Sequence, residues 1–171
     1  MKQVFCVKPF NGAVDIDVSV PGSKSMTNRA LLLAALAEGE SVLRGVGMSD
    51  DSRVFMEALT ALGFDLAEKY AADGSISIRV TGHGGELPQK KASVYVGSAG
   101  TAARFLTAMM GLSDGCYEVT SSDQMKARPM RELLEALELL GARFTFHEET
   151  YAFPFTVCGR RFLSEDRKSV V

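Results

Sequence analysis

The sequence predicts an α/β fold built from two repeats of a β-α-β-α-β-β unit, and three observations lead to it. Two Gly-rich turns, beginning at Gly22 and Gly97, are 75 residues apart. An arginine follows each turn at the same distance, since Arg29 and Arg104 are also 75 residues apart. Stretches in which apolar and polar residues alternate take turns with stretches of helical periodicity, which is typical of mixed folds. Such a spacing indicates one supersecondary unit that occurs twice.

The register of the repeat persists beyond the turns. Arg53 and Arg128 are again 75 residues apart, whereas the spacing becomes 78 at Leu62 and Leu140. The sequence therefore places one insertion of three residues between these points of the second unit.

Turn residues and helix caps define the first unit, residues 14–81. Val14 to Val20 alternates strictly between apolar and polar residues, which predicts a strand. Ser23 or Ser25 suits the N-cap of the following helix, and Ser49 suits the N-cap of the next one. The expected elements are a strand over 14–20, a helix with its body over 29–38, a strand over 40–46, a helix after Ser49 that ends before Gly63, and strands over 64–69 and 75–81.

The second unit, residues 92–159, follows a polar connector over 82–91. Pro129 is allowed in the first turn of a helix, because that turn needs no N–H from it. Residues 1–13 are predicted to be a strand or linker, and residues 160–171, which begin no third copy, an irregular tail. The expected elements are strands over 93–96 and 117–120, helices over 101–112 and from Pro129 to Leu140, and strands over 143–147 and 153–157.

Composition argues against several functions. The net charge is −2, from 19 basic and 21 acidic residues, so there is no global attraction to nucleic acid or to an anionic membrane. Two histidines and cysteines without metal-ligand spacing argue against a metal site or metal cofactor. The odd number of cysteines (Cys6, Cys116 and Cys158) and the absence of an apolar leader predict reduced thiols in a cytoplasmic protein.

The first Gly-rich turn combines features that bind phosphate. A helix N-terminus presents unpaired N–H groups and partial positive charge, and Gly22 lets a ligand approach the backbone. Lys24 adds a point charge, while Ser25 and Arg29 share one helix face. The alternative is a helix cap with two solvated cations. A nucleotide-binding P-loop is excluded, because Ser23 separates Gly22 from Lys24.

The second turn offers a similar arrangement. Small residues from Gly97 to Thr101 let an anion touch the main chain, and Arg104 follows one turn into the helix. Arg128, fixed by the proline after it, supplies a further cation. The alternatives are a tight strand-to-helix turn and a solvated loop charge.

Four motifs, in this order, resemble the 5-enolpyruvylshikimate-3-phosphate synthase family over residues 9–155. The motifs are residues 21–25 with 28–37, residues 49–51 with Arg53, residues 97–101 with Arg104, and residues 126–130.

The resemblance implies transfer of the enolpyruvyl group of phosphoenolpyruvate to the 5-hydroxyl of shikimate 3-phosphate, in the cytoplasm and without a cofactor. It also implies an inside-out α/β barrel of two lobes, each with three such units, of which two units are present here. The residue roles that it implies are Lys24 at both substrates, Ser25 and Arg29 at shikimate 3-phosphate, Gly100 and Arg128 at phosphoenolpyruvate, and Thr101 and Arg104 along the same wall.

Two departures from the family accompany this resemblance. Ser98 stands where the family usually has Asn. The third unit and the second lobe, which carries the acid and base residues of the family, do not follow, so we expect no turnover by this chain alone. A complementing C-terminal lobe or self-association is the expected partner relationship. The alternatives are a non-catalytic phosphate-binding module and a UDP-sugar enolpyruvyl transferase, which residues 121–125 disfavour because they lack a cysteine.

Overall fold

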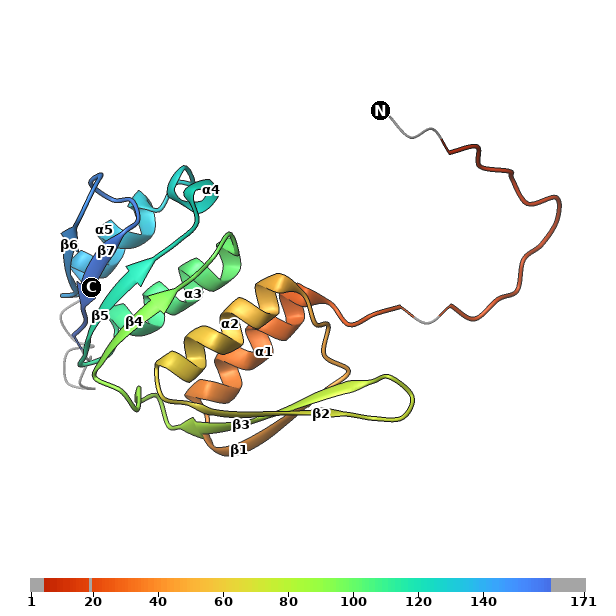
Figure 1. Cartoon of the computed structure of the whole chain (residues 1–171), viewed down its shortest axis with the longest axis horizontal. Helices are drawn as coiled ribbons and strands as arrows, with labels where there is room; N and C mark the ends of the chain where they lie inside the picture. Colours follow the sequence, from red (N-terminus) through yellow and green to blue (C-terminus); the bar gives the residue numbers. More distant parts are fainter. Residues whose placement is uncertain (1–4, 19, 161–171) are drawn as a thin grey trace, which may run out of the picture.

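The computed structural model describes residues 5–18 and 20–160, and it consists of two sheets with helices packed between and beside them (Figure 1). Helices α1 (Lys24–Leu36), α2 (Asp50–Ala61) and α3 (Gly100–Gly111) all contact one another. Because these three helices carry apolar faces from both units, the units share one buried core.

The first unit is a three-stranded antiparallel sheet in the order β1-β3-β2. Its helices begin where caps predict them: the Ser23 hydroxyl accepts from the Met26 N–H at 3.4 Å, and the Ser49 hydroxyl accepts from the Ser52 N–H at 3.2 Å. Both N-caps are thereby confirmed. The strands are β1 (Glu38–Arg44), β2 (Asp65–Tyr70) and β3 (Ile76–His83).

The second unit is a four-stranded sheet in the order β4-β5-β7-β6, with β4 parallel to β5 and the other pairs antiparallel. A short helix that the sequence did not predict, α4 (Asp123–Lys126), precedes α5 (Arg131–Leu139). The last helix therefore begins two residues after Pro129 rather than at it. The strands are β4 (Lys91–Tyr95), β5 (Cys116–Thr120), β6 (Arg143–Phe146) and β7 (Phe155–Cys158).

The repeat is visible in the pairing of the strands. In both units the strand after the first helix lies antiparallel to the last strand, and equivalent inward-facing residues stand opposite each other. The matching pairs are Ser41–Val80 with Tyr117–Val157, and Leu43–Ile78 with Val119–Phe155. The duplicated sequence thus produces a duplicated register.

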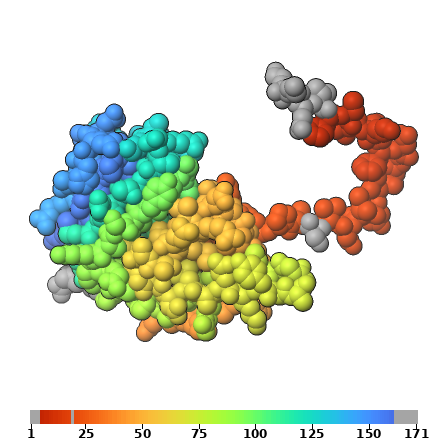
Figure 2. All heavy atoms as spheres, viewed as in Figure 1, coloured from red at the N-terminus to blue at the C-terminus, as the bar shows by residue number. Residues whose placement is uncertain are grey.

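The strand predicted over 14–20 is wrong for the described residues of that range. Residues 5–18 form no strand and run away from the body of the molecule (Figures 1 and 2), with Ile16 66% exposed. In the second unit the Val96 N–H bonds to the Thr120 carbonyl at 2.9 Å, which continues the parallel pairing past β4. Pro21 occupies the equivalent position in the first unit and has no N–H to give.

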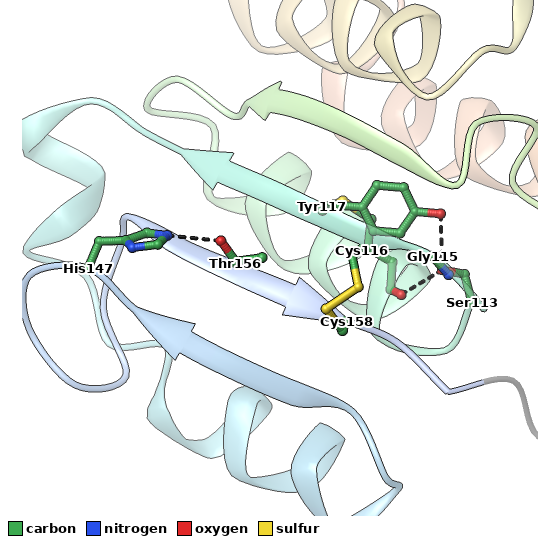
Figure 3. Close-up of a disulfide and its surroundings, with 8 residues drawn as sticks. Ser113, Gly115, Cys116, Tyr117, His147, Thr156 and Cys158 are labelled. Carbon is green, nitrogen blue, oxygen red and sulfur yellow. Dashed lines mark hydrogen bonds between the residues drawn. A yellow bond between two sulfur atoms is a disulfide. The ribbon is translucent and has the colours of Figure 1, made fainter.

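The expectation of three reduced thiols is also wrong for two of them. Cys116 and Cys158 face each other across β5 and β7 with Cα atoms 4.0 Å apart, and they form a disulfide (Figure 3). Cys6 is a free cysteine. Sequence spacing could not show this pairing, because antiparallel strands bring together residues that are 42 apart in the chain.

Two further points concern membrane-spanning helices and the C-terminal tail. No helix among the described residues is long and apolar enough to cross a membrane. The tail predicted over 160–171 lies outside the described residues, apart from Arg160.

Candidate functional site

A cavity of about 620 Å³ opens between the N-terminal ends of α1 and α3 and the segment before α5. Both Gly-rich turns lead into it, because each turn ends at a helix N-terminus. Its charged lining consists of four cations and one carboxylate: Lys24, Arg29, Arg104, Arg128 and Asp51. The excess of positive charge around a helix N-terminus suits an anionic ligand.

The structure brings together six of the seven residues predicted for the site. Gly100 and Thr101 line the cavity with the four cations. Ser25 is not among the lining residues; it is the second residue of α1, and its carbonyl accepts a bond from Arg29.

The two helix N-termini differ in their capping. The hydroxyl of Ser23 caps α1, so that one orphan N–H is already satisfied. Ala99 is the N-cap of α3 and makes no side-chain cap bond. Because no side chain competes there, the first turn of α3 offers its N–H groups to an anion more freely.

Arg29 and Arg104 repeat the same local contact, one in each unit. Arg29 Nη1 donates to the Ser25 carbonyl at 2.9 Å, and Arg104 Nη1 donates to the Gly100 carbonyl at 3.3 Å. The Arg29 guanidinium also lies 5.8 Å from the centre of the Phe105 ring, which joins α1 to α3 by a cation–π contact. Both arginines are thus oriented toward the cavity from adjacent helices.

Gly100 lies directly under two guanidinium groups. A Cβ added there would lie 2.8 Å from Arg128 Nη1 and 3.2 Å from Arg104 Nη1. The absence of a side chain therefore lets both arginines converge on the N-terminus of α3. An anion placed there would meet backbone N–H groups of α3 together with the planar Arg128 guanidinium, with Arg104 beside it.

Lys126 belongs to the same motif as Arg128 (residues 126–130), and its amine is engaged outside the cavity. Its amine lies 2.9 Å and 3.0 Å from the two carboxylate oxygens of Glu148. This hydrogen bond raises the pKa of Lys126 above its usual value. Of the motif over residues 126–130, Arg128 is the residue that lines the cavity.

The structure corrects the pairing of Arg53 with Arg128. Arg53 lies inside α2 and does not line the cavity, whereas Arg128 precedes α5. The C-terminal ends of α2 and α5 correspond at a spacing of 78 residues instead. Gly63 and Gly141, which are 78 residues apart, each follow the C-cap of their helix and have positive φ, 91° and 97°. The three residues that the second unit gained thus lie before α5, in the stretch that carries Arg128.

Residues that the sequence reading missed also line the cavity. Asp51, in the first turn of α2, lies 3.1 Å from the Lys24 amine. Gln124 comes from the unpredicted α4. Asp51 meets Lys24 across 27 residues of sequence, and Gln124 is placed by a helix of four residues. Local sequence patterns could therefore predict neither Asp51 nor Gln124 as a cavity residue.

Metal ligation finds no support within the part of the chain that the structure describes. No group of three or more His, Cys, Asp or Glu side chains is arranged to hold a metal ion there. His147 bonds instead to the Thr156 hydroxyl at 2.9 Å (Figure 3).

Comparison with known families gives a match over most of the chain. The profile of the EPSP synthase family, described as 3-phosphoshikimate 1-carboxyvinyltransferase, matches residues 10–167. The chain is 40% identical over 157 residues to the 3-phosphoshikimate 1-carboxyvinyltransferase of Trichormus variabilis, which covers 91% of this chain and 36% of that protein. It is 46% identical over 129 residues to the enzyme of Ralstonia nicotianae, covering 75% of this chain and 29% of that protein.

A solved structure gives the same result. EPSP synthase from Acinetobacter baumannii superposes with a TM-score of 0.71 at 25% identity, over 85% of this chain and 32% of that chain. The match confirms the predicted fold class. The chain spans about a third of the length of these relatives.

Proposed function

The chain belongs to the EPSP synthase family, and from this premise we propose that it supplies half of a substrate site for enolpyruvyl transfer. The reaction moves the enolpyruvyl group of phosphoenolpyruvate to the 5-hydroxyl of shikimate 3-phosphate and releases phosphate. This step belongs to the shikimate pathway, which leads through chorismate to the aromatic amino acids. The supporting observation is the convergence of Arg104 and Arg128 over Gly100 at an uncapped helix N-terminus.

We assign the residues of the cavity as follows. Lys24 contacts both substrates, because it lies at the start of α1 on the cavity wall. Ser25 and Arg29 hold shikimate 3-phosphate from the same helix, with Ser25 acting through the first turn of α1. Gly100 and Arg128 hold phosphoenolpyruvate, while Thr101 and Arg104 complete that wall. Two anionic substrates need this many cations, since a desolvated phosphate is stabilised only when it is paired.

In this proposal the described residues bind and orient, and they do not exchange protons with the reacting atoms. Positioning two substrates in one cavity and stabilising the charge on the departing phosphate are large contributions to such a transfer. The acid and base are assigned to a complementing C-terminal lobe. We therefore propose that the chain alone binds substrate but does not turn over.

A complementing polypeptide is the partner that we propose. Residues 14–18 carry alternating apolar side chains without a partner strand among the described residues, and Val14, Ile16 and Val18 are 47%, 66% and 72% exposed. A strand of another sheet would bury them. A cytoplasmic location is proposed as well, because phosphate esters carry too much charge to cross a bilayer unaided.

The test is a calorimetric titration with shikimate 3-phosphate, in which wild type is compared with Lys24→Ala and with Lys69→Ala, an exposed lysine of β2 outside the cavity. The expected result is saturable binding by wild type and Lys69→Ala that is at least tenfold weaker in Lys24→Ala. Equal binding by all three chains would contradict the assignment of Lys24. Absence of binding by a chain that circular dichroism shows to be folded would contradict the preformed half-site.

A second candidate is a non-catalytic phosphate-binding module that self-associates through its exposed apolar segment. The exposed side chains of residues 5–18 favour it. Light scattering and calorimetry together separate the candidates. A dimer by light scattering that binds inorganic phosphate as tightly as shikimate 3-phosphate in calorimetry fits only the module. The structure does not support the alternative of a UDP-sugar enolpyruvyl transferase, which would need a cysteine in the loop before Arg128. Cys116, which precedes that loop, is held in a disulfide and does not line the cavity.

A further inference from the structure

We propose that Ser98 and Arg104 are positioning residues that clamp residues 122–129, here called the Arg128 segment, against the N-terminus of α3. The inference deepens the proposed function, on which it rests, by separating the side chains that hold the anion from those that hold Arg128. In this division Arg128 meets the ligand, while Arg104 and Ser98 act through the main chain and hydroxyl of the segment.

The start of the Arg128 segment is fixed by Ser98. The hydroxyl oxygens of Ser98 and Ser122 lie 2.6 Å apart, and the Ser122 N–H donates to the Gly97 carbonyl at 3.1 Å. Ser122 is also the N-cap of α4, because its hydroxyl oxygen accepts from the Met125 N–H at 3.3 Å. One contact therefore joins the Gly-rich turn before α3 to the cap of the helix that precedes Arg128.

The end of the segment is fixed by Arg104. Arg104 Nη2 donates to the Pro129 carbonyl at 2.9 Å, while its Nη1 donates to the Gly100 carbonyl at 3.3 Å. A planar guanidinium with two main-chain acceptors is held in one orientation. Since Pro129 follows Arg128 directly, this contact fixes the backbone from which the Arg128 side chain extends.

The middle of the segment is anchored in the core. Met125 is fully buried, and its carbonyl accepts from the Arg128 N–H at 3.0 Å. The Arg128 side chain itself has no ion pair with a carboxylate among the described residues. The segment is thus held at both ends and in the centre, while its one cavity-facing cation stays available for a ligand.

The first unit shows which part of this arrangement is new. Arg29 makes the same bond to the carbonyl four residues before it as Arg104 does, so that bond belongs to the repeat. Ser23, at the position that matches Ser98, caps α1 instead. Among the described residues, the first unit has no hydroxyl contact equivalent to Ser98–Ser122 and no second guanidinium bond equivalent to Arg104–Pro129.

Hydrogen exchange of the Arg128 segment, measured by mass spectrometry without any anion, tests the clamp. The variants are Ser98→Ala, which loses the hydroxyl, Ser98→Thr, which keeps it, and Arg104→Lys, which keeps the charge and loses the fork. Ser93→Ala is the matched control, because it removes a hydroxyl bonded to Glu118 at 2.8 Å outside the cavity. Circular dichroism checks that each chain folds.

The expected result is exchange over residues 122–129 that is about three- to tenfold faster in Ser98→Ala and Arg104→Lys, the factor that one net hydrogen bond provides. Ser98→Thr and Ser93→Ala should exchange as wild type does. Affinity for inorganic phosphate should fall by a similar factor in the two loosened variants and recover in Ser98→Thr.

Two results would overturn the proposal. Wild-type exchange in both Ser98→Ala and Arg104→Lys would show that neither residue holds the segment. Wild-type exchange in Arg104→Lys combined with lost phosphate binding would make Arg104 a ligand of the anion. Faster exchange in a chain that binds neither phosphate nor shikimate 3-phosphate would support the clamp and contradict the proposed function, so the two failures are distinguishable.

Discussion

The amine of Lys24 lies 3.1 Å from Asp51 Oδ2, so the cation at the start of α1 is already paired with the first turn of α2. The pair is solvent-accessible, with side-chain exposures of 62% and 34%. Such pairs contribute little to stability. Its importance is therefore local: a phosphate that approaches Lys24 meets a carboxylate competing for the same amine.

Replacing that carboxylate should strengthen anion binding. We expect Asp51→Asn to bind inorganic phosphate about two- to fivefold more tightly at low salt, because one negative charge leaves a cavity lined by four cations. The gain should shrink at high ionic strength. Asp50→Asn is the control, since Asp50 is exposed and does not line the cavity. Weaker binding in calorimetry would instead assign Asp51 the task of orienting Lys24.

A methyl group on Gly100 should reduce anion binding without unfolding the chain. In Gly100→Ala the new Cβ would meet only side-chain ends among its nearest neighbours, those of Arg128 and Arg104, so these guanidinium groups are displaced while the backbone stays in place. We expect phosphate affinity to fall roughly tenfold, since charge-assisted bonds are displaced. Gly111→Ala, at the other end of α3, serves as the control, because the nearest neighbours of its new Cβ belong to Leu137. Unchanged affinity in Gly100→Ala would mean that the guanidinium groups do not act together at this turn.

Reduction of the Cys116–Cys158 bond should destabilise the chain. A link between residues 42 apart restricts the unfolded chain by about 4 kcal/mol in the loop-entropy description. Urea unfolding with and without a thiol reductant measures the effect, and the double variant Cys116→Ser with Cys158→Ser should behave as the reduced chain does. Cys6→Ser should leave the oxidised midpoint unchanged. Identical midpoints under both conditions would show that the bond does not form in solution.

Tyr117 should make stability fall at alkaline pH. Burial raises its pKa above the usual value, and its hydroxyl donates to the Gln89 carbonyl at 3.0 Å, beside Ser113 (Figure 3). The unfolded chain therefore loses the phenolic proton first, so stability is lost as the pH rises above about 10. Tyr117→Phe should cost about 1 kcal/mol at pH 7.

The pH profile of Tyr117→Phe supplies the check on that explanation. Denaturant titrations between pH 8 and pH 11 should show a flatter decline in the free energy of unfolding for the variant. The pKa of Lys90 is raised mainly by its hydrogen bond to Asp114, so Lys90 adds a decline in both chains, while its attraction to the ionised Tyr117 is absent from the variant. Parallel profiles would contradict the role of Tyr117.

Local signals in the sequence were sufficient for most elements. Serine caps and the positive-φ glycines after α2 and α5 defined helix ends to within a few residues. The prediction of a strand over 14–20 was wrong because alternation shows only which side chains could share a face. Whether a strand pairs depends on its neighbour, and Pro21 removes the N–H at the position where Val96 makes that contact.

The candidate site was predictable where it consists of turns, and it was not where it depends on distant contacts. Gly100, Arg104 and Arg128 are close to one another because two turns and one loop meet at α3. The pairing of Lys24 with Asp51 links two helices, and nothing in either local sequence encodes it. Likewise, the equal spacing of Arg53 and Arg128 was coincidental, because inserted residues changed the register before α5.

The outer edge of β1 has no partner strand among the described residues, and its acidic side chains make self-association depend on ionic strength. Among the described residues β1 bonds only to β3, so its other side offers main-chain groups to any extended chain. Glu38 and Glu40 stand at the beginning of that edge, and two copies that approached there would bring like charges together. Dissolved salt screens this repulsion, while the main-chain groups of the edge stay exposed. Concentrated stocks of the chain are therefore best kept at low ionic strength.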